Sequence, residues 1–129
     1  MIQPKKSKVC LLENNILHIK LKEDSLFDLF DYKEIRLASL RLTQQRQVYN
    51  LIQIGDRTIP NKEAREACTK DAANGYIKAE AIVISSLGQR ILANHMLRQQ
   101  KHLIPRKVFS NVEQAKAWLR ELQTPEVVC

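Results

Sequence analysis

This sequence has little glycine, few aromatic residues and few cysteines. Its 129 residues include three glycines, three cysteines and one tryptophan, and aromatic residues make up 5%. The glycines lie too far apart to form a glycine-rich phosphate-binding loop. An odd number of cysteines without short spacing argues against a disulfide framework or a zinc site. We therefore expect ordinary reduced thiols, two of them buried or half-buried and one on a loose tail: Cys10, Cys68 and Cys129.

The sequence also lacks a long hydrophobic run. No stretch approaches the roughly 20 apolar residues that a membrane-spanning helix needs. The basic N-terminus is followed by only a short apolar run, residues 9–12, before Glu13, which is too short for the core of a signal peptide. These absences predict a cytoplasmic protein that makes no membrane contact.

Acidic residues are missing from one long segment. The net charge is +7, yet residues 81–112 contain five basic residues and no acid, and residues 1–22 contain five basic residues against one acid. Such asymmetry is typical of a surface that meets phosphate, nucleic acid or an acidic partner. The alternative is a solubilising surface that binds nothing.

Length and composition indicate a single globular domain. Hydrophobic residues make up 44% and charged residues 27%, which are ordinary values for a packed protein. We expect a domain over residues 9–122, with a flexible basic segment at residues 1–8 and a flexible tail at residues 123–129.

Apolar patterning predicts strands that alternate with helices. A hairpin around Glu13-Asn14-Asn15 comes first, because asparagine tolerates the positive φ of a tight turn. The expected strands are 9–12, 16–21, 48–54, 79–84 and 107–109. Helices are expected from about 26 to 42, from 61 to 75, from 86 to 101 and from 111 to 122.

Polar residues at the expected helix starts suggest how the helices are capped. Asp24 or Ser25 caps the first helix, Asn61 the second, and Ser110 with Glu113 forms a capping box for the last. The last helix is expected to bury Trp118.

The resulting order is β-β-α-β-α-β-α-β-α. Strands connected through helices favour a largely parallel sheet, to which the hairpin adds an antiparallel edge. The fold class is therefore α/β, with a mixed sheet and helices mainly on one face.

That order and several segments resemble the STAS domain, the fold of the anti-sigma-factor antagonists of sporulating bacteria. The match is closer to small stand-alone bacterial STAS-like proteins of uncharacterised role. It covers about residues 9–122 and is carried by Glu63-Ala64-Arg65-Glu66, by residues 81–86 leading into 92–94, and by residues 104–105, 108–110, 113 and 117–119. The resemblance implies a regulatory module that acts by binding another protein.

In the antagonists, a partner kinase phosphorylates a serine at the start of the helix after the third strand. Here that helix is expected to open at Asn61, and the antagonists' Asp-Ser-Ser/Thr-Gly pattern is absent. The nearest hydroxyl, that of Thr58, lies in the loop. Thr58 and Asn61 therefore mark a degenerate switch region, and we expect the phosphorylation switch to be lost.

The residues offer no catalytic constellation. His95 and His102 lie two helical turns apart, too far to share one metal without a third ligand. Ser85-Ser86 lacks the glycines of a nucleophile elbow, so Ser86 is better explained as a helix cap. Cys68 has no evident base and is expected to face the core. We predict no catalytic residues, no cofactor and no metal.

A basic stripe on the third expected helix is the candidate binding site. Arg90, Asn94, Arg98 and Lys101 recur at spacings of four, four and three, which places them on one face. Leu92, Ala93, Met96 and Leu97 are expected to face the sheet instead. Arg106 and Lys107 follow soon after and extend the positive field. A solvated helix face without a ligand is the alternative.

Three functions remain open. The first is a non-catalytic, STAS-like protein-interaction module whose partner is another protein, in particular an acidic one. The second is a nucleic-acid-associated basic protein, although no aromatic residues interleave with the basic stripe for base stacking. The third is a carrier of a small apolar or anionic ligand, for which a chain of this size has little spare volume.

Overall fold

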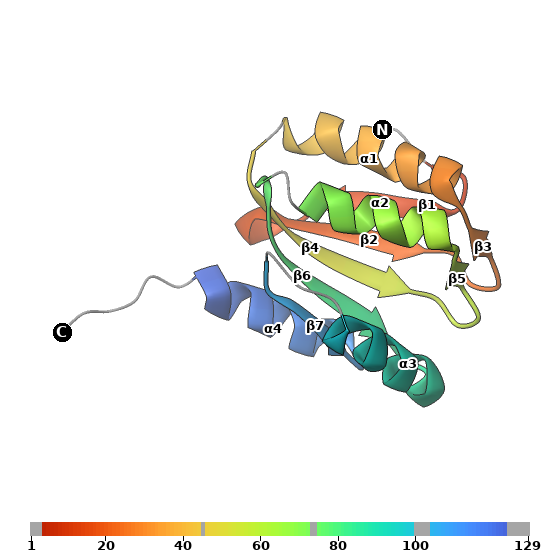
Figure 1. The fold of residues 1–129 in the computed structure, drawn as a ribbon. Coiled ribbons are helices and arrows are strands. Elements are labelled where there is room, and N and C mark those ends of the chain that lie inside the picture. Colours follow the sequence, from red (N-terminus) through yellow and green to blue (C-terminus); the bar gives the residue numbers. More distant parts are fainter. Residues whose placement is uncertain (1–3, 45, 73–74, 100–103, 124–129) are drawn as a thin grey trace.

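The computed structural model describes residues 4–44, 46–72, 75–99 and 104–123, and Figure 1 shows how they are arranged. The elements are β1 (Ser7–Leu11), a 3-10 turn (Glu13–Asn15), β2 (Ile16–Leu21), β3 (Leu26–Phe27), α1 (Leu29–Thr43), β4 (Val48–Ile54), β5 (Ile59–Pro60), α2 (Lys62–Ala72), β6 (Ile77–Ile84), α3 (Leu87–Arg98), β7 (Arg106–Phe109) and α4 (Val112–Gln123).

Five strands form one mixed sheet in the order β1-β2-β4-β6-β7. β1 and β2 pair antiparallel, and every other neighbouring pair is parallel. The hairpin therefore lies at one edge of the sheet, as predicted, and β7 forms the other edge. Asn14 and Asn15 both take positive φ in the hairpin turn, which confirms the reason for expecting a turn there.

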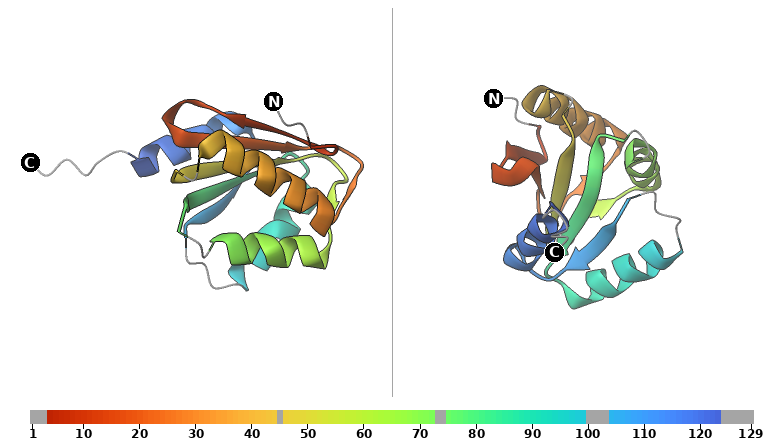
Figure 2. Two further views of the ribbon diagram at one scale, coloured as in Figure 1. Left: turned by 90° about the horizontal axis from the view of Figure 1, so that it is seen from above. Right: turned by 90° about the vertical axis from the view of Figure 1, so that its left-hand side faces the viewer.

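Helices cover the two faces of the sheet unequally. α1 and α2 pack over one face with a core that includes Leu17, Ile19 and Ile35. α3 lies on the same face, where its residues share a cavity wall with α2, and α4 covers the other face (Figure 2). The core under α4 contains Leu51, Leu119 and three small or branched residues of β6: Ala79, Ala81 and Val83. The expected α/β class, with helices mainly on one face, is confirmed.

Several boundaries differ from the sequence prediction. β1 begins at Ser7, and the Lys6 ammonium lies 2.9 Å from the Asp31 carboxylate, so the packed domain starts before residue 9. Leu26 does not open a helix. It belongs to the short strand β3, which pairs with β5 in a separate two-stranded sheet that the sequence did not predict.

Two caps also differ from expectation, while two agree. Asp28, not Asp24 or Ser25, caps α1 through a reciprocal pair of hydrogen bonds with Asp31. The α4 cap is Asn111, whose Oδ1 accepts from the Gln114 amide at 2.9 Å, so the predicted box of Ser110 and Glu113 is wrong. The predicted caps of α2 and α3 are confirmed: Asn61 Oδ1 accepts from the Ala64 amide at 2.9 Å, and the Ser86 hydroxyl accepts from the Gln89 amide.

Trp118 is half-buried, less than expected. Its ring lies 5.5 Å from that of Phe109, measured between centroids, at the border of the core under α4. The Trp118 ring therefore packs against this core on one side and is partly exposed to solvent on the other.

Candidate binding surfaces

The carboxyl ends of the parallel strands are joined by two tightly connected loops. Backbone hydrogen bonds link Asp24 to Asp56, Ser25 to Ile59, and Phe27 to Asn61. A side chain at Gly55 would lie 2.9 Å from the backbone of Glu23, so glycine permits this approach. An ion pair between Arg57 and Asp24 closes the contact. The loops thus form a fixed platform at this end of the sheet.

A hollow of about 740 Å³ opens between this platform and α3. Its apolar lining includes Ile59, Pro60, Leu92 and Met96. Polar groups on its wall are already engaged: the Ser85 hydroxyl donates to Asp56 at 2.9 Å, and Arg65 donates to the Pro60 carbonyl at 2.7 Å. The hollow suits an apolar occupant better than a charged one.

Exposed hydrophobic side chains gather around the same end of the molecule. Among the residues that the structure describes, large hydrophobic side chains are exposed at eight positions. Six of these lie on the first two turns of α1 and α3 or on β3 and β5: Leu26, Phe30, Ile59, Leu87, Ile91 and Leu92. Leu26 and Ile59 are partners in the β3–β5 register. We call these six residues the apolar rim. An exposed group of this kind is typical of an interaction site.

The degenerate switch region lies within the platform. Thr58 is buried, and its hydroxyl donates to the Lys22 carbonyl. Phosphate on this hydroxyl would break that bond. Asn61 holds the capping position of α2, as described above. The absence of phosphorylation here stays a prediction.

The structure separates the predicted basic residues. Asn94 and Arg98 are exposed on α3, as expected, and so is His95. Arg90 is not free on that face, because its guanidinium turns back and donates to the carbonyls of Ile84 and Ser85 at 3.0 and 2.7 Å. Lys101 lies outside the described residues.

Arg106 departs furthest from expectation. Its side chain is only 11% exposed, and its Nε lies 3.0 Å from Oε1 of the buried Glu80 on the neighbouring strand. Lys107 points the other way and is exposed, with its ammonium 5.5 Å above the Phe109 ring. A continuous basic surface from α3 through β7 therefore does not form.

Three of the predicted residues nevertheless line one groove. Arg90 and Asn94 from α3 meet Lys107 from β7 and Trp118 and Glu121 from α4 around an open groove of about 660 Å³. The spacing of residues on α3 could not reveal this groove, because its walls come from three separate elements.

The four apolar residues of α3 that we expected to face the sheet are not buried. In its described span no residue is buried, and Leu92 is 59% exposed. Ala93, Met96 and Leu97 are half-buried and line a second, mainly apolar cavity of about 160 Å³ between α2, α3 and the sheet. The prediction was wrong for Leu92 and partly correct for the other three.

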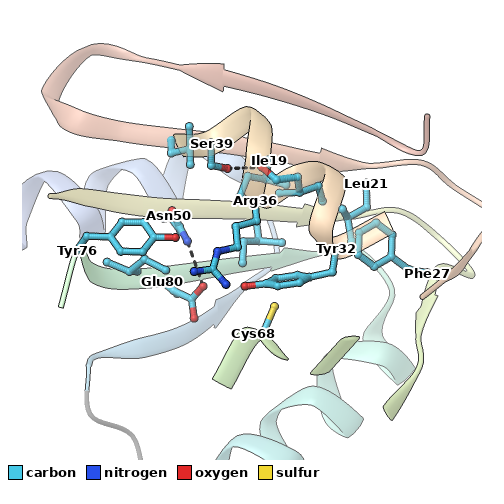
Figure 3. Close-up of a pocket in the computed structure, with 14 residues that line it drawn as sticks. Ile19, Leu21, Phe27, Tyr32, Arg36, Ser39, Asn50, Cys68, Tyr76 and Glu80 are labelled. Carbon is cyan, nitrogen blue, oxygen red and sulfur yellow. Dashed lines mark hydrogen bonds between the residues drawn. The ribbon is translucent and has the colours of Figure 1, made fainter. Parts of the chain in front are cut away.

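A small internal cavity of about 70 Å³ under α1 and α2 is bordered by paired polar groups, shown in Figure 3. Asp71 accepts a hydrogen bond from the Tyr32 hydroxyl and pairs with Arg36 at 3.0 Å. Glu80, beneath them, accepts from the Asn50 amide at 3.2 Å.

The environment of this cavity suppresses ionisation of the groups that could react. Burial raises the pKa of the Cys68 thiol to about 12, and the nearby charge of Glu80 adds to that effect. Burial likewise raises the pKa of Tyr32 far above its usual range. Both groups are therefore neutral at physiological pH, and neither is activated as a nucleophile.

The remaining histidines and cysteines form no site in the described residues. His18 is half-buried and lies 3.1 Å from Gln53, whereas His95 is exposed beside Gln99. Cys10 is exposed on β1, which corrects the expectation that it would be covered. His102 and Cys129 fall outside the described residues. Among those described, no three His, Cys, Asp or Glu side chains could hold a metal ion.

A comparison with protein families decides where the chain belongs. A family described as a domain of unknown function, DUF7793, matches residues 10–123. The chain is a member of this family. No protein of curated function matches the DUF7793 chain. Within the described residues of this DUF7793 protein, no helix combines the length and apolar character needed to cross a membrane.

The fold itself has a counterpart among solved structures. An uncharacterised protein of the DUF3478 family from Shewanella loihica PV-4, with a SpoIIAA-like fold, superposes with a TM-score of 0.60 and 15% identity. The alignment covers 88% of the DUF7793 chain and 91% of the Shewanella chain. The STAS-like resemblance seen in the sequence is thus confirmed for the fold.

Proposed function

We propose that this protein is a non-catalytic, regulatory protein-binding module whose partner docks on the apolar rim. The observation that carries the proposal is that six exposed large hydrophobic side chains lie at the carboxyl end of the sheet, two of which, Ile59 and Leu92, line the hollow there. Burying such side chains contributes roughly 25 cal/mol for each Å² of apolar surface removed from water. The SpoIIAA-like fold supports a binding role by analogy alone.

The partner's chemistry follows from the rim's surroundings. Leu87 and Ile91 are 65% and 60% exposed and lie one turn apart on α3, and the exposed Arg98 continues the same face. The sequence from residue 81 to residue 112 contains no acid. A partner surface with an apolar centre and an acidic margin toward α3 therefore complements this side of the molecule.

The other two functions receive less support. Several basic side chains are neutralised by acids from distant segments, namely Lys6 by Asp31, Arg36 by Asp71, Arg57 by Asp24 and Arg106 by Glu80. This pairing breaks up the positive field that nucleic acid would need. The apolar cavity of about 160 Å³ would hold a ligand no larger than a single ring, which is small for a carrier.

The test compares a rim variant with a control variant on another exposed surface. Quantitative affinity capture should identify proteins retained by the wild type and lost with Ile91→Ser plus Leu92→Ser. Leu37→Ser is the matched control, because Leu37 is 59% exposed but is not a rim residue and lies on α1 about two turns beyond Phe30, whereas the substituted rim residues lie on α3. The candidate is then purified and titrated by calorimetry. We expect a negative heat-capacity change and at least about tenfold weaker binding by the double variant.

Two results would contradict the proposal. One is equal binding of the purified partner to the rim variant and to Leu37→Ser. The other is light scattering that shows wild-type dimers which the rim substitutions dissociate, because the rim would then be occupied by a second copy of the chain.

A further inference from the structure

A basic surface, separate from the apolar rim, lies on the sheet face that α4 covers only in part. α4 contacts mainly β4, β6 and β7 and leaves the hairpin strands β1 and β2 largely open on this face (Figure 2). Four cationic or titratable side chains lie there, and we call them the hairpin patch: Lys8, His18, Lys20 and Lys116. We infer that the hairpin patch binds an acidic segment of another protein, in which several aspartate or glutamate side chains lie close together.

Strand register places the hairpin patch on one face of the sheet. Leu51 belongs to the core under α4, and His18 is its register partner, so the His18 side chain points to the same face. Lys20 lies two residues beyond His18 and shares this face. Lys8 is in turn the register partner of Lys20. The intervening Ile19 points to the other core, under α1 and α2.

Lys8 and Lys20 face each other at close range. The Lys22 amide donates to the Lys6 carbonyl at 2.8 Å, so Lys8 and Lys20 are the next hydrogen-bonded pair of this antiparallel ladder. Side chains that are directly opposite begin about 5 Å apart, and like charges in such a pair destabilise the strands. A carboxylate that binds between the two ammonium groups removes this repulsion, so its binding also stabilises the hairpin.

The cations of the hairpin patch lack the pairing that neutralises Lys6, Arg36, Arg57 and Arg106. Within the described part of the chain, Lys8, Lys20 and Lys116 form no ion pair. Lys8 and Lys20 are exposed, while Lys116 is half-buried, and its charge acts on the His18 ring together with that of Lys20. Positive charge therefore accumulates at one place on this face, and clustered carboxylates complement it.

His18 adds a donor to the patch when it is protonated. Its Nε2 lies 3.1 Å from Oε1 of Gln53, which can only accept, so Nε2 carries the hydrogen of the neutral ring and Nδ1 carries none. Protonation adds a hydrogen at Nδ1 and a positive charge. The polar and charged groups around the ring on this face are Lys8 and Cys10 from β1, Lys20 from β2, Gln53 from β4 and Lys116 from α4. A bound carboxylate favours the protonated ring, so binding strengthens as the pH falls.

The make-up of the patch favours a protein segment over other polyanions. Its three lysines are few compared with the roughly 6–10 phosphates that a duplex-binding protein contacts. The sequences of β1 and β2 contain no aromatic residue on which a base could stack. Among the described residues, the large exposed hydrophobic side chains lie on elements other than the hairpin, so the hairpin offers a membrane no apolar anchor.

The experiment uses the full chain and the acetylated, amidated peptide Ser-Asp-Asp-Asp-Asp-Ser, with Ser-Asn-Asn-Asn-Asn-Ser as the uncharged control. Nitrogen–proton NMR spectra should show shifts of the amides of Lys8, His18 and Lys20 with the acidic peptide and none with the control. We expect a Kd near or below about 1 mM at about 20 mM salt, and binding at least about fivefold weaker at about 200 mM salt.

Two double variants of equal net charge locate the site. Lys8→Gln plus Lys20→Gln should weaken binding of the acidic peptide about five- to tenfold. The control is Lys33→Gln plus Lys70→Gln, which removes two exposed lysines from α1 and α2 on the other face and should leave binding within about twofold. The first variant loses a repulsive pair, so urea unfolding should show that it is at least as stable as the wild type.

The His18 ring reports occupancy from inside the patch. Saturating acidic peptide should raise the pKa of His18, followed through its imidazole NMR signals. The wild type should also gain more affinity than His18→Gln when the pH falls from about 7.5 to about 5.5, a range in which the aspartates of the peptide stay ionised. Equal gains in the two proteins would contradict the placement of His18 in the site.

Three other results would overturn the inference. They are equal binding of the peptide by the two double variants, an unchanged pKa of His18 at saturation, and tighter binding at the same residues by a thymidine oligonucleotide or by vesicles of phosphatidylserine and phosphatidylcholine in equal parts. Ile91→Ser plus Leu92→Ser should not affect peptide binding, because both residues lie on α3 over the other face. This test and that of the apolar rim therefore fail separately.

Discussion

α1 and α3 occupy similar places in the fold but differ in what they bury. Each connects two neighbouring parallel strands across the same face of the sheet. α1 buries five residues, including Ile35 and Ala38, and α3 buries none over its described length. α1 contacts the edge strand β1 and the neighbouring helix α2, whereas α3 contacts β6 and the opposite edge strand β7.

This difference shows how the neighbours of a helix decide which of its residues are buried. α1 packs against both a strand and a second helix, so its apolar residues are buried in the core. A helix at the edge has solvent on its outer side, and Leu87 and Ile91 are left available for a partner. Four predictions test this division, beginning with the largest expected effect.

Arg106 tests whether the edge strand is joined to the core by a buried charge. Arg106→Ala leaves the buried Glu80 carboxylate without this partner, and we expect a loss of about 3–5 kcal/mol in the free energy of unfolding. Lys107→Ala, at the exposed neighbouring position, should cost at most about 0.5 kcal/mol. Urea unfolding followed by circular dichroism measures both, and equal losses would show that Arg106 is an ordinary surface cation.

A pair of isoleucines compares the two helices directly. Ile35→Ala on α1 removes a buried side chain and should cost about 2–5 kcal/mol, because it opens a cavity under the helix. Ile91→Ala on α3 should change the stability by at most about 0.5 kcal/mol. Thermal and urea unfolding give both values. A large loss at Ile91 would mean that α3 packs against the core as tightly as α1 does.

The cap of α2 tests the degenerate switch position. Asn61→Ala removes the oxygen that accepts from the Ala64 amide and should cost about 1 kcal/mol. Asn61→Ser should retain most of the stability, because serine caps about as well. Mass spectrometry after incubation with source-cell extract and ATP should detect no phosphate on residues 58–62 of the wild type. Stoichiometric phosphate on Thr58 would instead show that a switch persists in the platform.

The smallest expected effect is a pH dependence of stability caused by His18, which lies on the face of the sheet that α4 covers. Burial lowers its pKa below the ordinary value, and the charges of Lys116 and Lys20 add to this, so the folded protein favours the neutral ring. The unfolded chain then binds more protons between the folded and unfolded pKa values. The stability that His18 contributes is present above about pH 6.5 and is lost as the pH falls.

His18→Gln isolates this effect, because glutamine can still bond to Gln53 but does not titrate. The wild type should lose more stability than the variant when the pH falls from about 7.5 to about 5. Equal losses in the two proteins would show that the histidine has the same pKa folded and unfolded.

Local patterns in the sequence determined the order of elements. Alternating apolar residues located β2, and a mostly apolar run located β4, both with the bounds that the structure has. The two asparagines located the hairpin turn, and Asn61 located the start of α2. These features depend on neighbouring residues: a strand alternates with period two, and a cap needs one acceptor beside a free amide. The STAS-like fold followed from that order together with the residues of the resemblance.

Tertiary structure alone decided which charges are free and which apolar residues are covered. Glu80 and Arg106 are far apart in the chain, and only the pairing of β6 with β7 brings them together. Leu92 has the helical spacing of a core residue, but α3 lies at the edge of the sheet and leaves this side chain exposed. The groove beside β7 likewise combines three elements. Such contacts join residues that are distant in sequence, and periodicity along one segment carries no information about what lies opposite it.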